Sequence, residues 1–137
     1  LQNEKILKHC ETYSQVKMAQ LDQLLHSDLI FKDDEFDIVK IYHELESRGF
    51  FPDDISNWPG KFGHLFTYGA LYYSYLLDRA LATKVWDELF EADPFSREAG
   101  DLFRKEVLEW GGSRDPWDCV RGVLKKSDIN VKDFVKV

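Results

Sequence analysis

The sequence has few residues of the kinds that cross-link small proteins or bind nucleic acid. Its 137 residues include two cysteines, and 18 basic against 25 acidic residues give a net charge of −7. Cys10 and Cys119 stand near opposite ends, so neither a disulfide scaffold nor a paired-cysteine metal site is indicated. We expect both thiols to be reduced and buried. The basic side chains are scattered among acidic ones, which makes nucleic acid a poor partner.

Long apolar runs are also missing. No segment approaches the roughly 18 consecutive apolar residues that a membrane span requires, and no signal or transit peptide is recognisable. The chain starts at Leu1 inside a segment with a helical pattern, so we expect a fragment or a processed product. Its length and its 44% hydrophobic content suffice for one core, and we expect residues 1–137 to form a single helical unit.

The spacing of apolar residues predicts an all-α fold. It favours a helix over residues 2–27 and a second one from Asp33-Asp34 to Gly49. Residues 50–63 are rich in turn formers and are expected to form a long loop, and loops of this length often have a function. A third helix is expected over 64–92.

Two Asp-Pro pairs predict later helix starts, because Asp caps a helix and Pro is tolerated at its first position. Asp93-Pro94 is expected to open a helix that stops at Gly111-Gly112. Asp115-Pro116 is expected to open the next helix, over 117–125, and Asn130 to cap a last short turn.

Several catalytic motifs are incomplete or missing. A zinc hydrolase helix needs two histidines one turn apart with a glutamate after the first, but His43-Glu44 is followed by Ser47 where the second histidine belongs. His43 is therefore interpreted as a surface helix residue, and no metal site is expected from this chain alone. Neither a Gly-x-Ser-x-Gly elbow nor a glycine-rich phosphate loop is present.

The segment FGHLFTYGALYYSYLL, which starts at Phe62, concentrates tyrosines. On a continuous helix Tyr68, Tyr72 and Tyr75 share one narrow face, and His64 joins it if the helix begins that early. Such a stripe is compatible with core packing. However, each buried phenol needs a hydrogen-bond partner, and a solvated cleft meets this demand at lower cost. A protonated phenol can also donate to an oxygen that becomes negative during a reaction.

The same segment resembles part of a known enzyme family. The pattern Phe62-x-His64-Leu65-x-x-Tyr68-Gly69-Ala70-x-Tyr72-Tyr73-Ser74-Tyr75-Leu76 is similar to the C-terminal part of the thimet oligopeptidase family of zinc metallopeptidases, and most closely to its mitochondrial members. Further matching motifs follow in order: Arg79-Ala80-x-Ala82, Val85-Trp86, Asp93-Pro94-Phe95-x-Arg97 and Gly111-Gly112. Upstream, Leu21-Asp22-Gln23 with His26 also matches.

The resemblance implies a mostly helical metalloendopeptidase whose zinc is bound by an HExxH helix upstream of Leu1. This chain would then be the C-terminal part of the catalytic domain, with 50–63 on the substrate side, and inactive without the N-terminal remainder. Tyr75 and Tyr68 would be catalytic donors to the oxyanion. His64, Tyr72 and Gly69 would bind substrate.

The resemblance further implies that N-terminal octapeptides are removed from imported precursor polypeptides in the mitochondrial matrix. Two alternatives remain open at this stage. One is a non-enzymatic helical module that binds a peptide or protein through its aromatic face. The other is a structural helical domain, which would be indicated if Tyr68, Tyr72 and Tyr75 were all buried with partners inside the protein.

Overall fold

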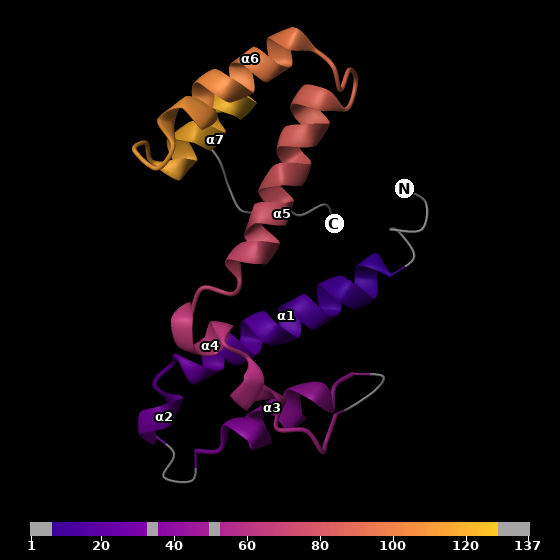
Figure 1. Cartoon of the computed structure of the whole chain (residues 1–137), viewed down its shortest axis with the longest axis vertical. Coiled ribbons are helices and arrows are strands. Elements are labelled where there is room, and N and C mark those ends of the chain that lie inside the picture. The colour runs from indigo at the N-terminus through magenta and orange to yellow at the C-terminus, as the bar shows by residue number, and fades with distance from the viewer. Residues whose placement is uncertain (1–6, 33–35, 50–52, 129–137) are drawn as a thin grey trace. The chain divides into compact units, whose positions relative to one another are not determined.

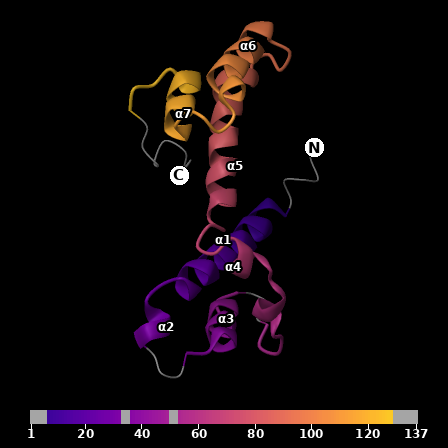
Figure 2. The same ribbon diagram turned by 60° about the vertical axis from the view of Figure 1, so that its left-hand side comes forward.

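The computed structural model describes residues 7–32, 36–49 and 53–128 (Figures 1 and 2). These ranges contain helices and turns and no strand, so the all-α prediction is confirmed for them. The chain divides into two compact units, residues 1–76 and 77–137, and each is described by itself. The expectation of a single helical unit over 1–137 stays a prediction.

The first unit is built on two packed helices and several shorter ones. Its elements are α1 (Lys8–Leu25), α2 (Leu29–Lys32), α3 (Ile38–Glu46), the 3₁₀ helix η2 (Trp58–Lys61) and α4 (His64–Thr67). The helix predicted over 2–27 is thus confirmed from Lys8 onward, and residues 1–6 lie outside the described ones. Asp33 and Asp34 also lie outside them, and the cap of α3 is Asp37, whose carboxylate accepts the amides of Val39 and Lys40.

The core of the first unit lies between α1 and α3. Leu21 of α1 packs against Tyr42 and Leu45 of α3, and all three are buried. At the edge of this contact the Lys17 ammonium lies 2.6 Å from the Glu46 carboxylate. Both charges are largely shielded from water, so the pair ties the two helices together more firmly than an exposed pair would.

The loop before α4 is tied to α3 by the Asp53 carboxylate. Asp53 accepts hydrogen bonds from the Ser56 hydroxyl, from the amides of Ile55 and Ser56, and from the Tyr42 hydroxyl at 3.0 Å. His43 Nε2 adds a bond to the Ser56 carbonyl at 3.0 Å. His43 is therefore half-buried and holds a loop, rather than being only a surface residue.

The second unit contains the larger part of α5 (Ser74–Val85), which begins in the first unit. It continues with the π-helical turn η3 (Trp86–Phe90), α6 (Arg97–Glu106), the 3₁₀ helix η4 (Leu108–Trp110) and α7 (Pro116–Leu124). Within this unit α6 and α7 lie side by side (Figures 1 and 2).

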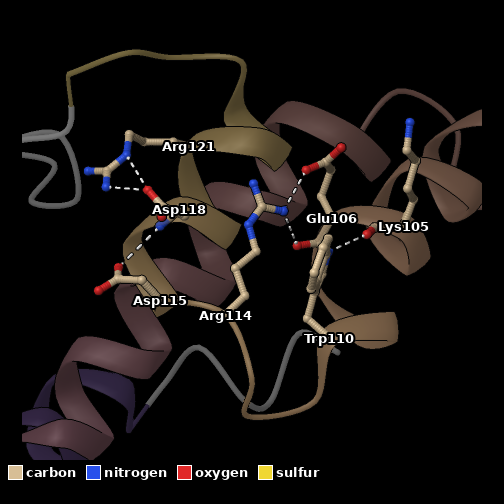
Figure 3. A network of polar contacts seen from close by, with 7 residues as sticks. All are labelled: Lys105, Glu106, Trp110, Arg114, Asp115, Asp118 and Arg121. Carbon is tan, nitrogen blue, oxygen red and sulfur yellow. Dashed lines mark hydrogen bonds and ion pairs between the residues drawn. The ribbon is translucent and has the colours of Figure 1, made fainter.

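A polar network joins α6 to the loop that leads into α7 (Figure 3). Arg114 Nη1 lies 2.8 Å from the Glu106 carboxylate and also donates to the Glu106 carbonyl. The Trp110 ring lies 5.2 Å from this guanidinium, and the Glu106 bond raises the pKa of Arg114. On α7, Gly122 leaves room for the Glu106 carboxylate, which a Cβ at this position would overlap. The network therefore depends on a glycine at the helix contact.

The two predicted Asp-Pro helix starts have different outcomes. Asp115 caps α7 and accepts the amides of Trp117 and Asp118, so the second prediction is confirmed. The first start is wrong by three residues, because Asp93 bonds the Phe95 amide in a separate turn and the cap of α6 is Ser96. The predicted stop of this helix at Gly111-Gly112 is also wrong, because α6 ends at Glu106 and Gly111, with a φ of +53°, follows the separate 3₁₀ helix η4. Asn130 lies outside the described residues.

The prediction of one continuous helix over 64–92 is wrong. Helix α4 ends at Thr67, a turn covers residues 68–73, and α5 begins only at Ser74. Beyond α5, η3 changes the hydrogen-bonding pattern of the last turns. The physical cause of the first interruption lies in the candidate site described below.

The sequence also led to expectations about the two cysteines and about membrane-spanning helices. Cys10 and Cys119 are both free, but the prediction that both are buried is correct for Cys119 and wrong for Cys10, which is exposed. Among the described residues, none of the helices has the length and apolar character of a membrane span.

The Asp53 anchor predicts an acid-sensitive contribution to stability. The Ser56 hydroxyl and amide, followed by Tyr42, lower the pKa of Asp53 from 3.8 to about 2. Because the folded-state value lies below the unfolded one, this stabilisation is complete above about pH 4 and is lost as the pH falls toward 2. We expect the urea midpoint of the protein to fall more steeply over this window than that of Asp53→Asn. If the urea midpoint fell equally steeply with pH in both proteins, Asp53 would not stabilise the folded state through these hydrogen bonds.

Candidate functional site

The candidate site is a cluster of aromatic rings around His64. The ring centroids of Phe62, Tyr68, Tyr72 and Tyr75 lie between 5.3 and 5.7 Å from the His64 centroid. The rings of Tyr72 and Tyr75 also contact each other edge-on at 5.1 Å. The sequence therefore predicted correctly that His64 and the three tyrosines gather, but not that Phe62 joins them, and all of these residues belong to the first unit.

The predicted route to this gathering is wrong. Tyr68 and Tyr72 do not share a helix face with Tyr75, because they lie on the turn between α4 and α5. Only Tyr75 is on α5, and His64 is the first residue of α4. The rings converge because the chain bends between the two helices, not because their spacing matches a helical repeat.

The main polar contact of the cluster joins His64 to Tyr75. His64 Nε2 lies 2.8 Å from the Tyr75 hydroxyl oxygen. If the ring carries its proton on Nε2, the imidazole donates to Tyr75 and the phenolic hydrogen is available to another acceptor. If the proton is on Nδ1, the phenol donates to Nε2 instead. The histidine tautomer thus decides whether Tyr75 can donate away from the cluster.

The three predicted tyrosines differ in exposure. Tyr68 is 58% exposed and Tyr75 is 47% exposed, whereas Tyr72 is 8% exposed. The Tyr72 hydroxyl donates to Gln15 Oε1 of α1 at 2.9 Å, which satisfies the phenol inside the protein. The structural-domain alternative required all three to be buried, so it does not describe this site. Tyr72 packs, while Tyr68 and Tyr75 face solvent.

The turn that interrupts the helix is fixed by a buried carboxylate on α1. Asp22 is 1% exposed, and its two oxygens accept the amides of Ala70 and Tyr72, each at 2.9 Å. Ala70 has a φ of +63°, a left-handed conformation that costs a non-glycine residue about 1 kcal/mol or more. The bonds to Asp22 offset this cost, because leaving a buried carboxylate without donors is expensive.

Two neighbours of Asp22 complete the contact with the turn. Gln23 Nε2 donates to the Ala70 carbonyl at 2.9 Å. The His26 ring, whose Nδ1 lies 2.8 Å from the Asp22 carbonyl oxygen, packs so closely on Gly69 that a Cβ there would overlap it. The predicted role of Gly69 in approaching a bound peptide stays a prediction, and the close approach that the structure contains is to His26.

Reasoning from residue types missed Asp22, Gln23 and His26 as site residues. They entered only as a matching motif, and no role was assigned to them. The one local signal is a carboxylate beside the apolar Leu21, Leu24 and Leu25 of α1, where a helix face turns toward the core. Such a position indicates a buried acid that needs donors, but it does not say which segment supplies them.

The cluster is supported by a row of stacked rings that leads back to the core. Tyr42 and Trp58 lie 5.6 Å apart, Trp58 and Phe62 4.6 Å apart, and Phe62 stacks on His64. Offset-stacked rings of this kind resist displacement because many contacts would be lost together. His64 is therefore backed by the hydrophobic core of the first unit.

The described residues do not form a metal site. No group of three His, Cys, Asp or Glu side chains comes together among them in a way that could hold an ion. His64 Nε2 is engaged by Tyr75 and His43 Nε2 by the Ser56 carbonyl. What the cluster offers chemically is a pair of exposed phenols, one of them hydrogen-bonded to an imidazole, which suits the stabilisation of a negatively charged oxygen.

Comparisons with known proteins agree on one family. A family model described as Peptidase family M3 matches residues 1–135. The chain is 58% identical over 131 residues to a protein of Vanderwaltozyma polyspora named mitochondrial intermediate peptidase, and 56% identical over 131 residues to one of that name from Candida glabrata. A third, from Yarrowia lipolytica, is 48% identical over 132 residues.

These matches cover nearly all of this chain and a small part of each relative. Each alignment includes 94% of the chain and 17% of the relative's own length. No solved structure matches the chain.

The packing of His26 on Gly69 leads to a stability prediction. Gly69→Ala is expected to lower the free energy of unfolding by about 1–3 kcal/mol, because the new methyl displaces a ring that is held by Asp22. Gly63→Ala is the matched control, since no described atom lies within 4 Å of its Cβ position. Urea unfolding of both variants checks this. Equal stabilities would show that His26 moves away freely.

Proposed function

The chain belongs to peptidase family M3, and on that premise we propose that it supplies the oxyanion-stabilising and substrate-binding residues of a metalloendopeptidase. Proteins of this family are zinc metallopeptidases. Since the chain spans 17% of the length of its relatives, the activity of the whole protein is part of the proposal.

The observation that carries the proposal is the exposed phenol of Tyr75 bonded to His64 at 2.8 Å. Hydrolysis of a peptide bond places a negative charge on the former carbonyl oxygen. A donor already oriented toward that oxygen stabilises the transition state more than the substrate, because the charge develops only as the reaction proceeds. Tyr75 is the described residue best suited to that role.

In this proposal His64 orients Tyr75. With its proton on Nε2, the imidazole donates to the phenolic oxygen and leaves the phenolic hydrogen directed away from the ring. A hydrogen bond accepted by a phenol also strengthens the one it donates, since the two polarise each other. The expectation that His64 contacts substrate stays a prediction beside this role.

Tyr68 is the second proposed donor. Its ring lies against His64 at 5.3 Å and its side chain is mostly exposed, so its hydroxyl can reach a bound peptide. Tyr72 has a different role, since its hydroxyl is bonded to Gln15 and its ring contacts both His64 and Tyr75 edge-on. We expect Tyr72 to support the substrate-binding surface by packing beneath it. We expect Gly69, which has no side chain, to let the backbone of the turn come close to the substrate.

Zinc, substrate and location complete the proposal. Because the family consists of zinc metallopeptidases, we place the zinc ligands in the remaining N-terminal part of the catalytic domain, which is then a required partner of this chain. The relatives' printed name supports a mitochondrial protease. The proposed reaction is the removal of N-terminal octapeptides from imported precursor polypeptides in the matrix. No observation on the described residues favours a non-enzymatic interaction module instead.

The role of Tyr75 is testable in the full-length enzyme. Tyr75→Phe is expected to lower kcat by roughly 10²-fold while KM changes little, because the lost donor acts mainly in the transition state. The measurement is steady-state cleavage of a precursor peptide that carries its octapeptide.

Tyr73→Phe is the matched control. Tyr73 is as exposed as Tyr75, but it is not one of the rings that contact His64 in the described structure. It should retain the activity of the parent enzyme. A Tyr75→Phe enzyme with unchanged kcat would rule out the proposed donor.

A further inference from the structure

The turn between α4 and α5 is what allows His64 to meet Tyr75. In a continuous helix, residues 64 and 75 would be separated by about 16 Å along the axis, at 1.5 Å per residue. In the structure their side chains are joined by a hydrogen bond of 2.8 Å. Tyr68 would likewise lie about 10 Å from Tyr75 along such a helix. The contact therefore requires the chain to bend between the two helices.

Nothing within residues 68–73 enforces that bend by itself. The segment lacks proline, and its single glycine, Gly69, stands beside an alanine that adopts φ +63° against its own preference. The residues that follow are leucine, a good helix former, and tyrosine, which lowers helix propensity only modestly and does not end a helix. A bend that costs the local backbone energy must be held by contacts from elsewhere in the chain.

Those contacts come from Asp22, which is 48 and 50 residues away from the two amides it binds. Oδ1 accepts the Ala70 amide and Oδ2 accepts the Tyr72 amide, both at 2.9 Å. Each oxygen thus bonds one donor of the turn, and the two donors flank Leu71. A carboxylate is required because both of its arms accept, whereas an asparagine would turn an N–H₂ group against one of the amides.

The rest of the surroundings keeps this carboxylate in place. Asp22 is 1% exposed, its Oδ1 lies 3.1 Å from His26 Nδ1, and Gln23 binds the Ala70 carbonyl from the same helix. The carboxylate therefore has donors on both arms and little access to water. Its bonds to the turn go to backbone amides, those of Ala70 and Tyr72.

We propose that Asp22 is a positioning residue, which holds the turn after α4 so that Tyr75 and His64 form the donor pair of the proposed peptidase site. The inference rests on the proposed function of Tyr75. Asp22 acts through the turn, so its loss displaces Tyr75 relative to His64 without removing any group that contacts substrate. A displacement of about 1 Å is enough to cost a large factor in rate when a donor must meet a developing charge.

The test uses Asp22→Asn in the full-length enzyme. We expect kcat to fall by at least roughly tenfold with KM little changed, since the donor geometry and not substrate binding is affected. Hydrogen exchange of the backbone amides of residues 69–73 in the folded enzyme should become at least about tenfold faster. The reason is that two backbone hydrogen bonds of the turn are weakened. Asp28→Asn is the matched control, since Asp28 is an exposed partner of Lys32, and it should change neither quantity.

A double-mutant cycle separates positioning from general loss of fold. If Asp22 acts through Tyr75, Asp22→Asn lowers kcat strongly in the parent enzyme and little in the Tyr75→Phe background. A merely structural role lowers kcat equally in both backgrounds and overturns the inference. Unchanged kcat and exchange in Asp22→Asn overturn it as well.

Two outcomes distinguish this inference from the proposed function. If Tyr75→Phe lowers kcat but Asp22→Asn does not, the positioning role fails and the function of Tyr75 stands. If Tyr75→Phe is without effect, the proposed function fails first. Should Asp22→Asn not fold, Gln23→Leu replaces it in the same cycle, because Gln23 bonds the same turn from an exposed position. Gln23→Leu is then expected to lower kcat several-fold in the parent enzyme, which retains Tyr75, and little in the Tyr75→Phe enzyme. Equal losses in both enzymes contradict the inference.

Discussion

The site depends on the bonds between one buried carboxylate and the backbone of a turn. Asp22 accepts the amides of Ala70 and Tyr72, and these bonds stabilise an interruption that the local sequence does not require. The interruption brings His64 and Tyr75 together from two different helices. Both Asp22 and its neighbour Leu21 belong to α1, so the helix that forms the hydrophobic core also fixes the turn. Helix α1 therefore contributes both to the packing of the core and to the geometry of the site.

The aromatic residues of the first unit have two different roles, packing and exposure of a hydroxyl. Trp58 and Phe62 continue the core as a row of stacked rings that ends at His64, while Tyr72 is buried and bonded to Gln15. Tyr68 and Tyr75 are left with their hydroxyls near solvent. A concentration of phenols that is costly in a core is thus resolved by satisfying one internally and exposing two. The exposed pair fits a protease whose transition state carries a negative oxygen.

Sequence reasoning was reliable where local chemistry decides the structure. Asp115-Pro116 opens α7 as expected, because a cap and a first-turn proline act within a few residues. The all-α class followed from apolar periodicity. The helix break after Thr67 was missed, since its cause is Asp22, about 50 residues away, and the local residues include no proline that would end a helix. The grouping of His64 with Tyr75 was predicted on a wrong geometry that placed their rings on one helix face.

The bend after α4 is the central claim, and a crystal structure of the full-length protein tests it most directly. The distance to measure is that between His64 Nε2 and the Tyr75 hydroxyl oxygen. We expect about 2.8 Å, with Ala70 in the left-handed region and both Asp22 oxygens on the backbone of the turn. An uninterrupted helix from His64 into α5, with the two side chains roughly 16 Å apart along its axis, would contradict the account.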